Sequence, residues 1–503
     1  MKKNSKVIAL CVFFNTLSST AHASFDQAIN QWFEPIAKVI SDIVFVSVSI
    51  NGTQAPLIVM LLVVCGVFFT GYLGFINIRG FGHALKIVRG DFADKKAPGE
   101  VTHFQALTTA ISGTVGVGNV AAVAIAISIG GPGITFWMIA AGLFGMSSKF
   151  AECTLGVKYR QENNDGSVFG GPMFYLEKGL AAINLPKLGK GLARYYAICI
   201  VIGALGIGCM FQSNQAYTIF VDTTGGELSY FSDKAWLVGA VLAILTAMVI
   251  VGGIKSIAAV TSKLVPVMAV LYIVSALVVL GVNADKLPYA FSAIISGAFS
   301  PEGMAGGLVG VLIIGFQRAA FSNEAGIGSA SIAHSAVQTK EPVTEGFVSM
   351  LEPFIDTVVI CTITSLVIIV TVYQPGVTGA NGISGVELTS AAFASVIPWF
   401  PYVLTVVVIL FAYSTIVAWS YYGLAGWVYL FGTGAKTKMA YNLSFCVFVM
   451  LGCAIELGSV LTFSDAMVFA MALANIIGLA LMAPVVKREL KEYWGRMEAK
   501  KSP

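Results

Sequence analysis

The sequence predicts an all-α polytopic membrane protein with eleven transmembrane helices, and three observations support this prediction. Of the 503 residues, 57% are hydrophobic and only 11% are charged, against about 25% charged residues in a typical globular domain. The mean hydropathy is +0.83, and apolar runs of about 20 residues, each long enough to cross a bilayer, recur along the chain. The basic residues, finally, are concentrated in alternate loops. Together these observations argue against a water-soluble fold.

Residues 1–23 have the pattern of a secretory signal peptide. Lysines stand at the start, residues 7–14 form a short apolar core, and an Ala-His-Ala cleavage site ends at Ala23. Cleavage would leave the mature N-terminus on the outer side; the alternative is an uncleaved extra helix. The segment 24–56 that follows is mixed and periodic, and we expect it to hold an amphipathic helix at the outer surface.

Eleven apolar runs then have the length of membrane-spanning helices. One precedes two successive groups of five. The expected spans are residues 57–76, 105–128, 133–156, 192–219, 235–252, 258–281, 305–330, 346–373, 401–430, 439–457 and 463–486.

The distribution of lysine and arginine gives these helices an orientation, because such residues favour cytoplasmic loops. The loops on one side and the C-terminal tail hold 21 of them, whereas the opposite segments hold three, Lys38, Lys234 and Lys286. This places the N-terminus outside and the C-terminus in the cytoplasm of a bacterial inner membrane. We expect the basic tail, residues 491–503, to contact anionic membrane lipid rather than nucleic acid.

Two of the spans are interrupted by similar glycine-rich segments. Residues 112–119 read SGTVGVGN and residues 322–329 read SNEAGIGS. Each segment opens one group of five helices, and because five is odd, the second group runs with opposite orientation. Paired broken helices in inverted repeats are typical of the midplane binding site of secondary transporters. The predicted repeat halves are residues 103–281 and 303–486.

A broken helix offers both signs of partial charge at the membrane midplane. Free N–H groups at the start of a half-helix favour an anion such as a carboxylate, and free carbonyls on the other side of the break favour a small cation. Gly116 and Gly118 would let a ligand approach the backbone closely. A zwitterionic amino acid together with a cation meets both requirements.

Several long motifs, in order, resemble the alanine/glycine:cation symporter family, and the resemblance covers about residues 57–490. The matching segments are HFQALTTAISGTVGVGNVAAVA (103–124), GGPGITFWMIAAGLFGMSSKFAE (130–152), GGPMFYLEKGL (170–180), VGGIKSIA (251–258), RAAFSNEAGIGSA (318–330) and FAYSTIVAWSYYG (411–423).

The resemblance implies a leucine-transporter-type fold, with one extra N-terminal helix before the five-plus-five repeat. It also implies import of alanine or glycine, small neutral amino acids, by symport with sodium. Matching positions imply a substrate site in which the first break holds the carboxylate and aromatic side chains close over the small side chain. The implied substrate-binding residues are Gly116, Val117, Gly118, Asn119, Gln212, Phe321, Thr415 and Trp419.

The resemblance further implies a sodium site built from carbonyls on the first broken helix and hydroxyls on the helix at 401–430. Five or six oxygens suit such a hard cation. The implied ligands are Ser112, Val115, Phe411, Ser414 and Thr415. A proton in place of sodium is the alternative.

One departure from the family pattern lies inside the first break. The family's usual break reads Thr-Ile-Gly-Thr-Gly-Asn, whereas this chain has Val117 at the second threonine. The backbone N–H is kept but a hydroxyl is lost, which leaves open a preference for glutamine or another neutral amino acid on the same fold.

Ionisable residues inside membrane spans are costly and indicate either helix pairing or function. We expect Lys149 and Glu152 to pair with each other, and Arg318 to pair with a neighbouring acid. Glu324 is expected to cap backbone N–H groups at the second break. Glu352 and Asp356 lie one turn apart and are expected to form part of a gate near the inner mouth.

Two other classes of protein are less consistent with the sequence. A membrane enzyme would need a nucleophile beside a base or a cofactor motif, and we find no histidine near a candidate nucleophile. No glycine-rich phosphate loop followed by Lys-Ser/Thr is present, so we expect no nucleotide. A channel would show rings of like charge or a repeated filter motif, and neither is visible.

Overall fold

The computed structural model describes residues 34–50, 53–94, 96–163, 166–300, 307–374 and 385–499. The predicted signal peptide lies outside the described residues. Within the segment 24–56, residues 34–44 are helical, and the chain then forms a short antiparallel hairpin of β1 (Ser47–Ile50) and β2 (Thr53–Pro56). A second hairpin joins β3 (Gln161–Glu162) and β4 (Val168–Phe169).

The rest of the described chain is a bundle of helices, and a helix or helical run lies at every predicted span. These elements are α2 (Leu57–Tyr72), α5 (His103–Thr114), η1 (Val117–Asn119), α6 (Ala121–Gly130), α7 (Ile134–Lys158), α9 (Pro186–Leu205), η2 (Gly206–Met210), α10 (Phe211–Thr223), α11 (Ala235–Ile250), α12 (Gly253–Val282), α14 (Gly307–Asn323), α15 (Ala330–His334), α16 (Pro342–Ser349), α17 (Leu351–Pro353), η5 (Phe354–Cys361), α18 (Thr362–Thr371), α20 (Phe400–Phe431), α21 (Ala435–Ala454) and α22 (Leu457–Ala499).

Among the described residues, seven helical runs are long and apolar enough to cross a membrane, and the bent pair α5–α6 makes an eighth. The helices α2, α11 and α14 are apolar but shorter. They occupy the remaining three predicted positions, so the count of eleven spans and the inverted repeat stay predictions.

Several helices between the spans were not expected from the sequence, because their apolar runs are too short to cross a bilayer. They are α3 (Ile76–Arg79), α4 (Phe81–Arg89), α8 (Pro172–Ala182), η3 (Gly226–Leu228), η4 (Ala284–Lys286), α13 (Leu287–Phe299) and α19 (Val386–Ala394).

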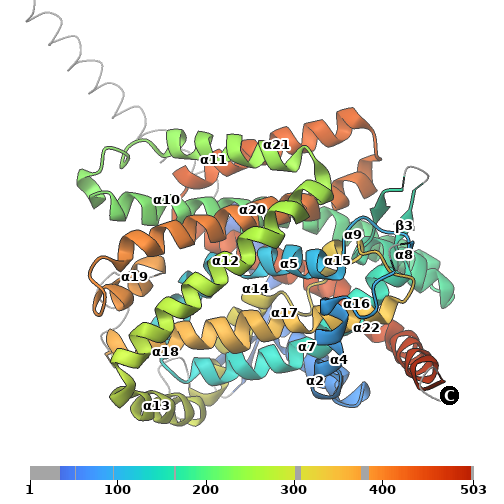
Figure 1. Cartoon of the computed structure of the whole chain (residues 1–503), viewed down its shortest axis with the longest axis horizontal. Coiled ribbons are helices and arrows are strands. Elements are labelled where there is room, and N and C mark those ends of the chain that lie inside the picture. The colour runs from blue at the N-terminus through green and yellow to red at the C-terminus, as the bar shows by residue number, and fades with distance from the viewer. Residues whose placement is uncertain are drawn as a thin grey trace, which may run out of the picture.

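Figure 1 shows how the bundle is layered around the broken helices. Helices α11 and α21 lie side by side along the top, α12 crosses the bundle diagonally, and the C-terminal end of α22 projects from it. Both α11 and α12 expose large apolar side chains, among them Val241, Met248, Val267 and Val274. In contrast, α5, α6 and the middle of α20 are almost entirely buried, so the broken helices form the centre of the bundle.

Glycine allows this centre to be tightly packed, because small residues let membrane helices approach closely. A Cβ placed on Gly208, in η2, would lie 2.2 Å from Cβ of Trp419 on α20. A Cβ on Gly133 would lie 2.2 Å from the carbonyl carbon of Gly297. Larger residues at these positions would push η2 away from α20, and α13 away from α7.

Candidate functional site

The first predicted break is present and separates two half-helices. Helix α5 begins with a capping box formed by Thr102 and Gln105, which satisfies two backbone N–H groups. It ends at Thr114, the chain is extended at Val115 and Gly116, and α6 then departs at 55° to α5. The break exposes backbone N–H and C=O groups inside the bundle, where they need partners.

The second predicted break is also present and is made by three residues of positive φ. After α14 ends, Glu324 has a φ of 56°, Gly326 of 87° and Gly328 of 94°. Glycine adopts this region without steric cost, whereas a left-handed glutamate is uncommon. Its side chain, described below, is held by two hydrogen bonds. Such strained residues concentrate at functional sites.

The predicted sodium ligands come together where α5 meets α20. The Ser112 hydroxyl donates to the Ser414 carbonyl at 2.7 Å, and the Thr415 hydroxyl donates back to the Ser112 carbonyl at 2.9 Å. The Ser414 hydroxyl donates to the Phe411 carbonyl at 3.0 Å, and Val115 lies buried at the end of α5. The structure thus gathers oxygen atoms from both helices, which is the donor chemistry that a hard cation prefers.

Gln212 reaches the first break from α10. Its amide nitrogen donates to the Ile207 carbonyl at 3.1 Å, and its amide oxygen accepts the Val117 N–H at 3.4 Å. The residue is the second of α10, which follows η2, a π-helical segment, and such segments are frequent at functional sites. A Cβ on Gly116 would lie 2.5 Å from the Thr415 hydroxyl oxygen and 3.3 Å from the Gln212 amide oxygen, so these side chains converge on the glycine.

Aromatic side chains border the same region. Phe321, near the end of α14, packs edge-on against Phe211 with ring centroids 5.4 Å apart. The nearest atoms to a Cβ placed on Gly118 would be the Phe321 ring carbons, at 3.9 Å. The predicted aromatic lid residue Phe321 therefore faces the first break.

Trp419 does more than pack, because its indole N–H links the two breaks. It donates to the Gly113 carbonyl, on α5, and to the Glu324 carboxylate, each at 3.1 Å. Glu324 also accepts a hydrogen bond from the Ser329 hydroxyl. In the described residues, the hydrogen bonds of the Glu324 side chain are made with side chains and not with the backbone N–H groups that sequence analysis had expected.

Asp356 was predicted to lie near the inner mouth, and this prediction was wrong, because the residue lies beside the first break. The Asn119 amide nitrogen donates to the Asp356 carboxylate at 2.6 Å and contacts the Ser322 hydroxyl at 3.1 Å. The Asn119 amide oxygen accepts the Gly116 N–H at 2.9 Å. Asn119, predicted to hold the substrate carboxylate, is thus bonded at both ends within the protein.

The predicted Lys149–Glu152 pair is also corrected. Lys149, fully buried on α7, forms its ion pair with Glu352 at 3.0 Å, while Glu152 accepts a hydrogen bond from the Asn475 amide at 2.9 Å. The spacing of three along one helix suggested a local pair. The two residues instead face different neighbours, and the ion pair joins α7 to α17.

Arg318 pairs with a neighbouring acid, as predicted, and the structure identifies it as Asp465 at 2.9 Å. Asp465 lies 147 positions away on α22. Asp465 falls inside the predicted span 463–486 but was not among the charges expected inside the membrane. The position of Asp465 within an apolar run could have indicated that it is a buried partner for a basic residue.

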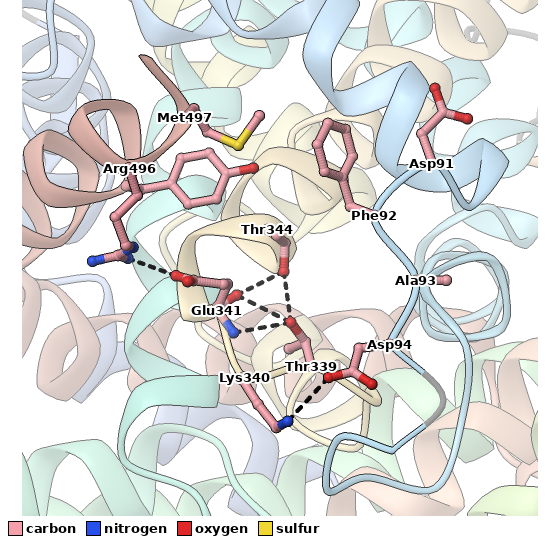
Figure 2. Close-up of a pocket in the computed structure, with 11 residues that line it drawn as sticks. Asp91, Phe92, Ala93, Asp94, Thr339, Lys340, Glu341, Thr344, Arg496 and Met497 are labelled. Atoms are coloured by element: carbon pink, nitrogen blue, oxygen red, sulfur yellow. Dashed lines mark hydrogen bonds and ion pairs between the residues drawn. The ribbon is translucent and has the colours of Figure 1, made fainter. Parts of the chain in front are cut away.

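A separate hollow of about 420 Å³ lies at the loop end of the bundle, between the segment after α4, the start of α16 and the end of α22 (Figure 2). Ion pairs cross it, Arg496 to Glu341 at 2.6 Å and Lys340 to Asp94 at 3.1 Å. The backbone N–H of Lys96 and the Lys340 ammonium hold the pKa of Asp94 below its usual value. None of the predicted site residues lines this hollow.

A polytopic bundle of apolar helices, in which two breaks meet around buried oxygen atoms and amide groups, defines a membrane transporter. Residues 38–503 match the sequence profile described as the sodium:alanine symporter family, and the chain belongs to that family. Sodium-coupled amino-acid transport is the activity that this membership assigns to it, and the family is one of transporters rather than enzymes.

Individual relatives agree with this assignment. A sodium/alanine symporter, AgcS, of Methanococcus maripaludis is 41% identical over 441 residues, which are 87% of this chain and 94% of the relative. A protein of Bacillus subtilis named "Probable sodium/glutamine symporter GlnT" is 31% identical over 452 residues, 89% of this chain and 90% of the relative.

A solved structure shows the fold. The crystal structure of MhsT in complex with L-phenylalanine superposes with a TM-score of 0.53 at 15% sequence identity, and covers 77% of this chain and 98% of that one. The chain therefore shares the overall helical arrangement of that structure, which belongs to the leucine-transporter-type fold.

Proposed function

We propose that this protein imports alanine or glycine across a bacterial inner membrane, by symport with sodium and by alternating access. The observation that carries the proposal is the convergence of Thr415 and Gln212 on Gly116 at the first break. Hydroxyl and carbonyl oxygens lie beside that glycine, and the backbone N–H groups of Gly116 and Val117 face the amide oxygens of Asn119 and Gln212. This arrangement suits a cation and a carboxylate bound next to each other.

The packing favours a small substrate side chain. Trp419 is fixed by two hydrogen bonds and by direct contact with Gly208, and Phe321 is fixed against Phe211. Aromatic residues held in this way leave little freedom to accommodate a longer side chain such as that of glutamine. We therefore place alanine or glycine ahead of glutamine.

The proposed orientation is the one given by the loop charges, with the N-terminus outside and the C-terminus in the cytoplasm. In this orientation α5 begins at the cytoplasmic side. Trp419 and Glu324 then lie on the cytoplasmic side of Thr415 and Phe321, and together they form a floor beneath the substrate. Release of substrate to the cytoplasm requires this floor to open.

The test is uptake of labelled alanine into proteoliposomes, with an inward sodium gradient or with choline in place of sodium. We expect uptake that needs sodium and that excess unlabelled glycine suppresses more strongly than glutamine does. Gln212→Ala and Asn119→Ala should strongly reduce it. Asn283→Ala, which removes a buried amide that follows α12 and is bonded to the Val279 carbonyl and the Lys286 ammonium, is the matched control and should transport. Uptake indifferent to sodium would refute the coupling.

A further inference from the structure

Five buried ionisable side chains form a continuous chain at the end of the bundle where α5 begins. His103, at the start of α5, and His334, at the end of α15, each direct Nδ1 at a different oxygen of the Glu345 carboxylate on α16. Nε2 of His334 lies 3.9 Å from the Glu352 carboxylate, and Glu352 pairs with Lys149 at 3.0 Å. None of the five side chains is more than 5% exposed. One carboxylate thus joins a half-helix of the first break to a half-helix of the second.

The backbone is closed at the same place. Val101, just before α5, forms a β-bridge with Val337, just after α15. A Cβ placed on Gly99 would lie 2.1 Å from the Val337 carbonyl oxygen. The Arg160 guanidinium donates to the Pro98 carbonyl at 2.8 Å and to the Val337 carbonyl at 2.7 Å. In the proposed orientation these contacts lie on the cytoplasmic side, so they have to part when substrate is released there.

The side-chain chain is short of one positive charge, because two carboxylates, Glu345 and Glu352, share the single ammonium of Lys149. The other ionisable groups that face these residues from the packed elements are Glu152 and Cys153 on α7, Glu324 at the second break, Asp356 on η5, Tyr422 on α20 and Arg160 after α7. Arg160 is the only cation in that set, and it pairs with Glu162 at 3.1 Å. Buried charges need compensation, so the surplus of acids favours one further proton.

Two atoms show where that proton fits. Nε2 of His334 and Oε2 of Glu352 are buried, and neither has a hydrogen-bond partner among the described residues. They face each other at 3.9 Å. Nδ1 of His334 uses its hydrogen toward Glu345, so a second proton on the same ring goes to Nε2 and makes an imidazolium between two carboxylates. Nε2 of His103 is also without a hydrogen-bond partner in the described chain, but the ion pair of that ring is made by Nδ1.

We infer that His334 is a proton-binding site, and that its imidazolium, held between Glu345 and Glu352, locks the cytoplasmic ends of the two broken helices together. The inference rests on the proposed function and orientation. This proton enters from the cytoplasm and returns to it, so it regulates transport and is not carried. Once the ends part, the ring meets water, where a histidine loses its proton near neutral pH. The closed state therefore holds one proton more than the open state, and a rising cytoplasmic pH favours opening.

The test is the initial rate of sodium-driven alanine uptake into right-side-out membrane vesicles, prepared from a host without alanine uptake of its own. The external pH is fixed and the internal pH is varied. One proton changes the balance between closed and open states by up to about tenfold per pH unit. We therefore expect the rate to rise about five- to tenfold from an internal pH of about 6.5 to about 8. The equilibrium alanine gradient at zero membrane potential should ignore a pH gradient, because the proton is not carried.

Three histidine variants locate the proton. His334→Asn keeps a donor at the position of Nδ1 but cannot take a second proton, so its uptake rate should not depend on internal pH. His103→Asn likewise keeps the donor to Glu345, and it should keep the pH dependence because the proton resides on His334. The matched control is His83→Gln, since His83 lies on α4 and its Nε2 is hydrogen-bonded with the Tyr493 hydroxyl; this variant should also keep the pH dependence.

The unaltered protein provides a second measurement, which decides the question if His334→Asn fails to fold. Imidazole nitrogen chemical shifts distinguish a doubly protonated ring from a neutral one. We expect one histidine to be doubly protonated at a pH of about 7.5, above the range in which an exposed histidine holds its proton. Its signal should persist in His103→Asn and in His83→Gln.

The inference is overturned if uptake by the unaltered protein does not depend on internal pH, or if every imidazole is neutral at that pH. It is also overturned if His334→Asn keeps the pH dependence, or if His103→Asn or His83→Gln loses it. An equilibrium alanine gradient that follows the pH gradient would make the proton a transported ion and would contradict the regulatory role. Uptake that ignores sodium in the unaltered protein would instead refute the proposed function.

Discussion

Gly116→Ala is the substitution whose effect the structure specifies most directly. The backbone of Gly116 is extended, with a φ of −142°, so alanine can adopt it without strain. The added methyl group, however, would lie 2.5 Å from the Thr415 hydroxyl oxygen and 3.3 Å from the Gln212 amide oxygen. The hydroxyl has to move, and it then loses its 2.9 Å hydrogen bond to the Ser112 carbonyl.

The magnitude follows from these two costs. Overpacking by one methyl group costs about 1–3 kcal/mol, and a buried hydrogen-bonding group left unsatisfied costs about 1–3 kcal/mol. The sum is at least about 2 kcal/mol, which corresponds to about 30-fold in an equilibrium constant. If the ligand-free protein relaxes by moving the first break away from α20, the whole cost appears as weaker binding of sodium and alanine. If it does not relax, part of the cost appears as a lower free energy of unfolding.

Both quantities can be measured on purified protein in detergent. Alanine affinity in saturating and limiting sodium gives the binding term, and thermal unfolding without substrate gives the stability term. Gly281→Ala, where an added Cβ meets nothing within 4 Å, controls for the change of glycine to alanine in itself. If Gly116→Ala changes neither affinity nor unfolding by more than the Gly281→Ala control, the packing derived for the first break is wrong.

Three further substitutions test other parts of the site. Thr415→Val keeps the shape of the side chain but removes the hydroxyl that donates to Ser112. The half-saturating sodium concentration for uptake should therefore rise by about tenfold or more. In the control Thr415→Ser, which keeps the hydroxyl, this concentration should stay near that of the unaltered protein. Trp419→Leu opens the proposed floor of the site, so glutamine should compete for alanine uptake more effectively; an unchanged competition profile would count against Trp419 as part of that floor. Lys149→Met leaves Glu352 buried without its 3.0 Å partner and should lower the free energy of unfolding by about 3–5 kcal/mol. Adding Glu352→Gln should recover most of this loss in the same thermal-unfolding assay.

Sequence reasoning located the backbone features of this protein better than its side-chain pairs. Both breaks could be predicted, because a run such as Gly116-Val-Gly118 cannot continue a helix cheaply and because glycine is needed at positive φ at Gly326 and Gly328. The apolar runs likewise predicted where helices occur, since hydropathy acts locally along the chain.

Partners distant in the sequence could not be obtained in this way. Lys149 was assigned to Glu152 on its own helix, but its partner lies 203 positions away, and the partner of Arg318 lies 147 positions away. Which buried charge meets which depends on the rotation of helices against each other. This rotation cannot be read from a single sequence, because contacts between distant helices follow no regular spacing along the chain. Asp356 was misplaced for the same reason, because only the packed structure shows that η5 passes beside the first break.

The packing also explains how movement at one break can be transmitted to the other. Helix α20 holds α5 through the hydrogen bonds of Thr415 and Ser112, and one turn further on, Trp419 donates to Gly113 and to Glu324. Movement of α20 away from both breaks therefore releases Gly113 and Glu324 together, at the same time as it disperses the oxygens of the proposed sodium site. Because a buried polar group left without a partner is costly, an intermediate with only one break released is disfavoured. The two breaks should then open together, which is the behaviour that coupled transport requires.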